Sequence, residues 1–246
     1  MKNSYLINES SFQTAWIQAV QKLDEHKWSF YNLIVQIEDV KKLDFEIHNK
    51  ITKFARKINI LSPKHVAYTV FPHNLYKRNN SSDKLFHAYN RRAGFYDRIK
   101  KHPRITWGTY FRRMTHYKQD DGEYVNQLDK VISALKNWEK SHKAAYTIVI
   151  PKPGTDTARP RGGPCLNYIV PQLVLINNSP SISLLCIYRN HDFLERAYGN
   201  YWALCNLTRF IADESDLNVG YLTCISSHAY IDKQKAQLKK LICEIS

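Results

Sequence analysis

The sequence has no apolar run that approaches the ~18 residues of a membrane-spanning helix. Its first ten residues, Met1 to Ser10, are polar and lack the pattern of a secretory signal. We therefore expect a cytoplasmic protein. Internal repeats, low-complexity tracts and linkers are also missing, which favours one folded domain over a repeat array or a chain of modules.

Paired cysteines are missing as well. The chain has 5 Cys, an odd number, and none of them forms a C-x-x-C pair. This pattern argues against a disulfide framework and against a zinc site, so we expect no metal. Cys165 stands apart because a Gly-Gly-Pro turn precedes it. The other four have apolar neighbours and are expected to be small core residues: Cys186, Cys205, Cys224 and Cys243.

Acidic residues are few: the chain has 22 Asp+Glu and 36 Lys+Arg, which gives a formal net charge of +14. Such an excess favours a polyanionic or phosphorylated partner, and a basic surface without any partner is the alternative. Residues 77–104 are dense in Lys, Arg and aromatic residues. We expect a solvated helix with aromatic anchors on one face. The alternative is a patch that stacks bases and grips phosphates, although no nucleic-acid motif is present.

Hydrophobic residues make up 43% of the chain, enough for a substantial core. Helical spacing predicts amphipathic helices over residues 11–24, 45–58 and 125–135, a buried central helix over 194–212 and a basic helix at the end. Short apolar or β-branched runs predict strands over residues 30–37, 65–71, 146–150, 168–176, 182–188 and 221–225. The predicted fold is a single α+β domain over residues 1–246, with a mixed or antiparallel sheet packed by helices.

The chemically distinctive stretch begins at Cys165, a single thiol with apolar, strand-like residues after it. Residues 188–192 (Tyr-Arg-Asn-His-Asp) and Asn200 follow, and residues 227–230 (Ser-His-Ala-Tyr) come near the end. An arginine could polarise the thiol, while amide and carboxylate groups could read a polar ring. Two further arginines in the loop before the thiol could grip a phosphate: Arg159 and Arg161. Taken singly, a cysteine after Gly-Pro is more often structural than catalytic, and an arginine after a strand is more often part of a surface ion pair.

Taken in order, these pieces resemble the thymidylate synthase family, which includes the pyrimidine nucleotide hydroxymethylases. Residues 126–136 resemble the family helix that begins Asp-Gln and ends Leu-Lys, and Pro164-Cys165 matches the nucleophile dipeptide. Residues 188–192 match the family's Tyr-Gln-Arg-Ser-x-Asp, with the arginine and the aspartate in register. Asn200 keeps the family spacing from that aspartate. Residues 216–220 and 228–230 match the end of the pattern, so the similarity covers residues 107–235.

The resemblance implies C5 methyl or hydroxymethyl transfer to a pyrimidine nucleoside monophosphate. The Cys165 thiolate would add to C6 of the ring, and C5 would attack a one-carbon unit from 5,10-methylenetetrahydrofolate. Arg189 would lower the pKa of the thiol and bind the 5′-phosphate. Asn200 would pair with the N3/O4 edge of the ring, which in the family goes with uracil rather than cytosine.

The same resemblance assigns supporting roles. Asp192 would bind the ring through its backbone and help to order the folate side, and Asn190 replaces a hydrogen-bonding serine. His228 and Tyr230 would contact the sugar hydroxyl. The family's phosphate-binding Ser-Arg-Arg, which reaches across a symmetric dimer, is here Ser-His-Lys. The family is usually homodimeric, so the resemblance implies a homodimer although the arginines that reach across it have changed. Two basic side chains of this run would lie near the phosphate: His142 and Lys143.

The chain departs from the family pattern elsewhere. Leu166 stands where the family has a histidine after the nucleophile. The N-terminal half has no counterpart of the family's Glu followed by Trp, which manages proton transfer and the one-carbon unit. The nucleotide half of the site is therefore better supported than the folate half. Two alternatives stay open: a family-fold protein that binds nucleotide without folate chemistry, and a basic nucleic-acid-binding protein.

Overall fold

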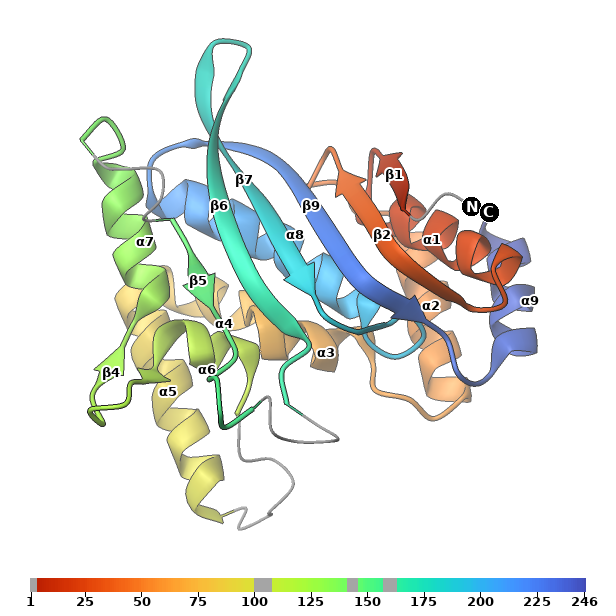
Figure 1. Ribbon diagram of the computed structural model, residues 1–246, viewed down its shortest axis with the longest axis horizontal. Helices are drawn as coiled ribbons and strands as arrows, with labels where there is room; N and C mark the ends of the chain where they lie inside the picture. Colours follow the sequence, from red (N-terminus) through yellow and green to blue (C-terminus); the bar gives the residue numbers. More distant parts are fainter. Residues whose placement is uncertain (1–3, 100–107, 141–145, 157–162) are drawn as a thin grey trace.

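The computed structural model describes residues 4–99, 108–140, 146–156 and 163–246. Within these residues, seven strands form a mixed sheet in the order β1-β2-β9-β7-β6-β5, with β8 beside β9 (Figure 1). The helices and the mixed sheet confirm the predicted α+β class. The strands of this sheet are β1 (Tyr5–Glu9), β2 (Ser29–Ile37), β5 (Ile148–Val149), β6 (Leu166–Ile176), β7 (Ser179–Tyr188), β8 (His191–Asp192) and β9 (Asn218–Tyr230). A separate small pair consists of β3 (Tyr117–Lys118) and β4 (Tyr124–Val125).

Several helices begin after a residue whose side chain caps the first turn. Ser11 accepts a hydrogen bond from the Thr14 amide at the start of the first helix, and Asn126 accepts one from the Asp129 amide further along. The helices are α1 (Phe12–Glu25), α2 (Phe45–Lys57), α3 (Pro63–Val70), α4 (His73–Asn79), α5 (Ser82–Ile99), α6 (Tyr110–Thr115), α7 (Gln127–Lys136), α8 (Ala197–Glu214) and α9 (Lys235–Ile245).

Two connections determine how the central strands of the sheet pair. Asn177 and Asn178, both with positive φ (50° and 59°), form the two-residue turn between β6 and β7. This left-handed pair is the backbone that a tight antiparallel hairpin requires. β7 and β9 are parallel, so their connection must cross the sheet, and α8 provides that crossing.

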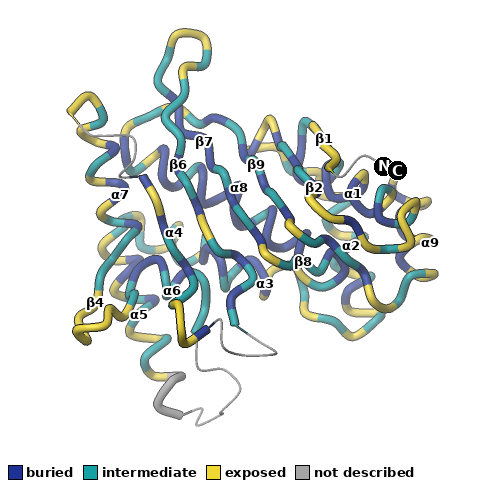
Figure 2. The backbone as a smooth tube through the Cα atoms, in the orientation of Figure 1, coloured by how far each residue is buried: buried dark blue, intermediate teal, exposed yellow. Residues whose placement is uncertain are grey.

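Helix α8 is the buried centre of the fold, as its apolar sequence predicts. Most of its side chains are buried, including Tyr201, Leu204 and Phe210. It lies behind β7 and β9 in Figure 1, and α3 packs against it. Figure 2 shows the buried residues gathered along α8 and the exposed ones at the β6–β7 turn. In the described part of the chain, no helix is long and apolar enough to cross a membrane.

The strand predicted over residues 65–71 is wrong: this segment is helix α3. Ser62 caps the His65 amide, and Pro63 occupies the first turn, where its fixed φ and missing N–H favour a helix. The β-branched Val66 and Val70 favour a strand locally, yet both are buried on one side of the helix. Tertiary packing against α8 therefore outweighs the local preference.

The prediction that Cys243 is a core residue is also wrong, because its side chain is exposed. It lies in α9, whose inner face is formed by Leu238, Leu241, Ile242 and Ile245. A position next to buried residues in sequence does not place Cys243 on their face of the helix, since each successive side chain is turned by a further 100°. The predictions for Cys186, Cys205 and Cys224 are confirmed, because all three are buried.

One face of the sheet carries an apolar row that no described helix covers in Figure 1. The pairing register aligns this row across five strands. Its members are partly or fully exposed, while their sequence neighbours point to the helices. The row consists of Leu6, Ile34, Ile225, Ile187 and Tyr168.

Candidate active site

The predicted site residues come together where several strands end. Cys165 lies directly before β6, and the main chain at Arg189, directly after β7, donates a hydrogen bond to the Cys165 carbonyl (2.9 Å). The chain then re-enters the sheet as β8, which pairs with the last residues of β9, Ala229 and Tyr230. Asn200 follows in the first turn of α8. Segments that are far apart in sequence therefore meet at one end of the strands.

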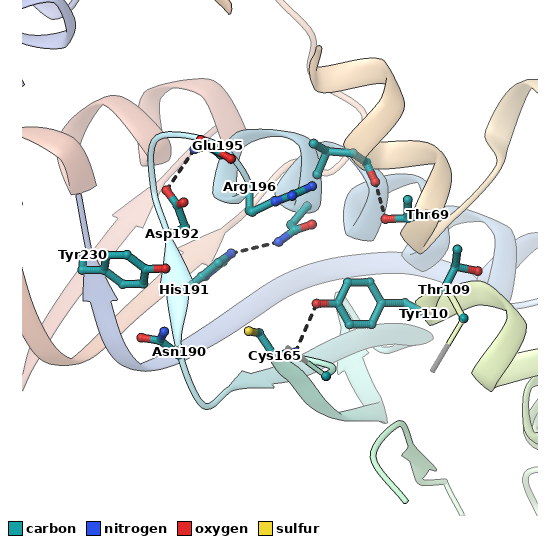
Figure 3. A pocket seen from close by; sticks show the side chains of 14 residues that line it. Thr69, Thr109, Tyr110, Cys165, Asn190, His191, Asp192, Glu195, Arg196 and Tyr230 are labelled. Carbon is teal, nitrogen blue, oxygen red and sulfur yellow. Dashed lines mark hydrogen bonds between the residues drawn. The ribbon is translucent and has the colours of Figure 1, made fainter. Parts of the chain in front are cut away.

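A cavity of about 420 Å³ lies at this meeting point (Figure 3). This volume is within the ~300–1,000 Å³ that is usual for small-molecule sites. Five of the predicted residues line it: Cys165, Asn190, Asp192, Asn200 and Tyr230. The remaining lining residues are Val66, Thr69, Gly108, Thr109, Tyr110, Gly163, His191, Glu195 and Arg196.

The Cys165 thiol is half-buried, and its burial raises its pKa above the ordinary value for cysteine. The positive charge of Arg189 and a hydrogen bond from it oppose this increase, and the charge of Arg196 adds to the opposition. Burial has the larger effect, so the group is a thiol rather than a thiolate at neutral pH. The guanidinium groups are nevertheless placed where they would stabilise the anion once it forms.

The backbone around the thiol is held by its neighbours. The Cys165 amide donates a hydrogen bond to the Tyr110 hydroxyl (3.2 Å), and burial raises the pKa of that hydroxyl to about 12. Gly163 has a φ of 89°, and a Cβ there would lie 3.5 Å from Nη2 of Arg189 and 3.2 Å from the Asp156 carbonyl. Gly163 thus lets the loop pass close to the guanidinium group without strain.

A buried ion pair anchors the loop that leads to the thiol. Arg113 donates to both carboxylate oxygens of Asp156, at 3.2 Å and 3.0 Å, and the two side chains are 13% and 2% exposed. The Lys152 amide donates a further hydrogen bond to Asp156 (2.7 Å). A two-point guanidinium–carboxylate contact fixes orientation as well as distance. The described part of the loop is therefore tied to α6.

Asn200 is buried (3% exposed) and is held by a histidine that the sequence analysis left without a role. Its Nδ2 lies 3.1 Å from Nε2 of His191, and Nδ1 of His191 lies 2.9 Å from the Ser226 hydroxyl. The imidazole stacks on Tyr188 with ring centroids 3.9 Å apart. Burial lowers the pKa of His191 to about 3, so the ring is neutral at neutral pH.

The carboxylate of Asp192 shapes the turn before α8. Its Oδ1 accepts hydrogen bonds from the amides of Leu194 (2.9 Å) and Glu195 (3.0 Å). Burial raises the pKa of Asp192, although these hydrogen bonds and the charge of Arg196 act in the other direction. Asp192 therefore lines the cavity and also determines how the chain enters α8.

His228 lies beside the cavity rather than in its wall. Its Nδ1 donates to Oδ1 of Asn190 (2.7 Å), and its Nε2 is 3.0 Å from the Ser29 hydroxyl. Its ring stacks on Tyr31 and on Tyr230, with centroids 4.8 Å and 5.3 Å away. The histidine thus supports two lining residues. Arg189 is likewise absent from the lining, being an exposed residue that reaches the thiol from the rim.

Some predicted residues lie outside the described part of the chain: His142, Lys143, Arg159 and Arg161. Other lining residues escaped the sequence analysis. His191 stood within a matched motif but had no role there, and Arg196 carried no motif at all. Val66 and Thr69 reach the cavity because α3 crosses α8, a tertiary contact that local sequence does not reveal.

The chain is similar to part of a known archaeal protein. No protein-family model matches the chain. A protein of Methanocaldococcus jannaschii named "Putative thymidylate synthase" is 30% identical over 139 residues. The match covers 55% of this chain and 60% of the relative, so the chain spans less than two thirds of that protein's length. It supports a distant thymidylate synthase-like relationship, which agrees with the resemblance found in the sequence.

Proposed function

We propose that this protein is a transferase of the thymidylate synthase type, which adds a one-carbon group to C5 of a pyrimidine nucleoside monophosphate. Cys165 is the nucleophile, and a uracil ring is the preferred base. One observation carries the proposal: a thiol with guanidinium groups beside it and a buried amide meet at a single cavity. The similarity to the archaeal relative supports the same class.

The residues present can perform the first half of such a reaction. The Cys165 thiol gives its proton to solvent, and the sulfur bonds to C6 while the electrons of the C5–C6 double bond move to C5 and O4. C5 then bonds to a one-carbon substituent and its original proton passes to solvent. The electrons of the broken C5–H bond restore the C5–C6 double bond as the C6–S bond breaks and releases the thiolate. Arg189 and Arg196 stabilise the sulfur anion at both ends of this cycle.

The nucleotide fits the polar groups available. Guanidinium forks bind phosphate at two points, and Arg189 lies exposed at the rim, where a 5′-phosphate can remain solvated. Asn200 offers both a donor and an acceptor from a buried position, which suits the N3/O4 edge of uracil. Tyr230 provides a hydroxyl for the sugar, and the net charge of +14 favours an anionic substrate.

The one-carbon donor that we propose is 5,10-methylenetetrahydrofolate, which would supply the new C5 substituent when bound. The wall that α3 and the turn before α8 contribute consists of Val66, Thr69, Glu195 and Arg196. Arg196 suits the carboxylates of a folate, but this wall offers no aromatic surface for its ring system. These residues fit a folate donor less completely than Cys165, Asn200 and Tyr230 fit a nucleotide.

We also propose that the protein is a homodimer that pairs the uncovered sheet faces of two copies. Partly exposed apolar side chains in register across five strands are a surface that association would bury. Ile225→Lys, in the central strand, should convert dimer to monomer in sedimentation analysis. Leu175→Lys, at the 73% exposed hairpin end, is the matched control and should remain dimeric. A monomeric wild-type protein would contradict this proposal.

The activity is tested with UMP, dUMP, CMP and dCMP labelled with tritium at C5. Thiol addition at C6 makes C5 exchange its hydrogen, so label release reports the first half of the reaction without knowledge of the donor. We expect release from a uracil nucleotide by the wild type and none by Cys165→Ala. Assays with methylenetetrahydrofolate then show whether a methyl or a hydroxymethyl product forms. No release from any of the four, despite saturable nucleotide binding, would leave a binding protein.

A nucleic-acid-binding function is less well supported. Of the aromatic residues described in α5, Phe86 and Tyr89 are buried and cannot stack on bases, while Phe95 is 52% exposed. Salt-dependent binding to oligonucleotides that does not change in Cys165→Ala or Arg189→Ala would favour this alternative over the enzyme.

A further inference from the structure

The side-chain amide of Asn200 has two ends that differ in what they recognise. Its oxygen accepts hydrogen bonds, whereas its NH₂ group donates them. Uracil presents an N–H donor at N3 and an acceptor at O4, and cytosine presents the opposite pattern at the same two positions. A 180° rotation of the amide would therefore exchange the preferred base. A residue that reads this edge needs a partner that holds it in one orientation.

His191 provides such a partner. The Asn200 NH₂ group donates to Nε2 of His191 (3.1 Å), which leaves the amide oxygen for another contact. Because a neutral imidazole has one donor and one acceptor nitrogen, Nδ1 must then carry the hydrogen, and it donates to the Ser226 hydroxyl (2.9 Å). Burial keeps the ring neutral, with its pKa lowered to about 3.

The ring itself cannot turn to offer a different nitrogen. It lies parallel to Tyr188 (interplanar angle 2°), and the edges of Phe193 and Tyr201 approach at centroid distances of 5.1 Å and 5.6 Å. His191 is 1% exposed, and its own backbone pairs with Ala229. Ser226, ring and amide thus form a fixed chain that ends at the cavity. Figure 3 shows His191 among the residues that line this cavity.

We propose that His191 is a positioning residue for base choice: by holding the Asn200 amide in one orientation, it makes the cavity select uracil over cytosine. This inference rests on the proposed function, because it takes the ligand to be a pyrimidine nucleotide. It goes further in assigning the selectivity to a hydrogen-bonded chain rather than to the asparagine alone. Asn200 without His191 should bind both bases with little preference.

The test measures the ratio of the dissociation constants for dCMP and dUMP, and for CMP and UMP, by titration calorimetry. His191→Phe keeps the ring stacked on Tyr188 but removes the acceptor. We expect the preference for uracil to fall about fivefold, the equivalent of one hydrogen bond, with a smaller effect on the affinity for the weaker base. His191→Gln places an amide near the former Nε2 position and should restore most of the ratio.

A purely structural role for His191 predicts a different result. Lost packing would lower the affinity for both bases equally and leave the ratio unchanged, and this outcome would overturn the proposal. If His191→Phe does not fold, Ser226→Ala tests the same chain from its other end and should reduce the ratio while leaving the ring in place. Failure of wild-type protein to bind any of the four nucleotides would instead refute the proposed function, and this inference with it.

Discussion

Gly199 is the point at which α3 and α8 approach most closely, and its substitution tests the packing that shapes the cavity. A Cβ at Gly199 would lie 2.6 Å from Cβ of Val66, 2.8 Å from its Cγ1 and 2.9 Å from the Pro63 carbonyl oxygen. Comfortable carbon contacts begin at ~3.5 Å, so α3 would have to move by about 0.9 Å. All three contacted atoms belong to α3, and no flexible side-chain end can yield in its place.

The expected cost combines two opposing effects. Overpacking of this kind destabilises by about 1–3 kcal/mol, while replacing glycine by alanine within a helix returns about 1 kcal/mol. Gly199→Ala should therefore lower the free energy of unfolding by up to about 2 kcal/mol. Gly94→Ala is the matched control: it lies within α5, and a Cβ there meets no atom within 4 Å. It should stabilise the protein by about 0.5–1 kcal/mol.

Urea unfolding followed by circular dichroism measures both changes, and nucleotide titration measures the consequence for the cavity. α3 supplies Val66 and Thr69 to the cavity wall, so Gly199→Ala should weaken nucleotide binding while Gly94→Ala should not. If Gly199→Ala is as stable as the wild type, or gains stability as Gly94→Ala does, then α3 does not lie against α8 at this point.

Three further predictions concern charge and base recognition. Arg113→Met leaves the carboxylate of Asp156 buried without its ion-pair partner, which should lower the free energy of unfolding in urea by about 3–5 kcal/mol. Arg113→Met combined with Asp156→Asn should lower it clearly less, and an equal loss would show that the buried charge is unimportant. His191 is protonated near pH 6.5 in the unfolded chain but only near pH 3 in the folded protein. As the pH is lowered from 6.5 to 3, the free energy of unfolding should therefore fall by up to about 1.4 kcal/mol per pH unit. His191→Phe should flatten this slope, and an unchanged slope would show that His191 is not its cause. Asn200→Asp should move the preference from uracil towards cytosine nucleotides in the titration, and an unchanged ratio would place the base elsewhere.

Sequence patterns predicted the parts of the fold in which local preference and packing agree. The helical spacing over residues 11–24 and 125–135 and the apolar runs at 30–37 and 168–176 correspond to α1, α7, β2 and β6. The prediction failed over residues 65–71, where the β-branched composition opposes the helix that α8 and the Ser62 cap select. Local sequence contains no record of that tertiary contact.

The candidate site was predictable to a similar extent. Motif spacing indicated Cys165, Asp192 and Asn200, and the structure places these three on one cavity. Motif spacing did not indicate that the pKa of the Cys165 thiol is raised, because the burial of the thiol depends on how the strands meet. The role of His191 was equally hidden, since its partner Ser226 comes from a strand 35 residues further along the chain.

Addition of the Cys165 sulfur to C6 of a pyrimidine nucleotide is best measured by the release of tritium from C5. Cys243→Ser is the matched control, because it removes an exposed thiol that does not line the cavity. We expect wild type and Cys243→Ser to release label from a uracil nucleotide at the same rate and Cys165→Ser to release none. Release that persists in Cys165→Ser would show that Cys165 is not the nucleophile.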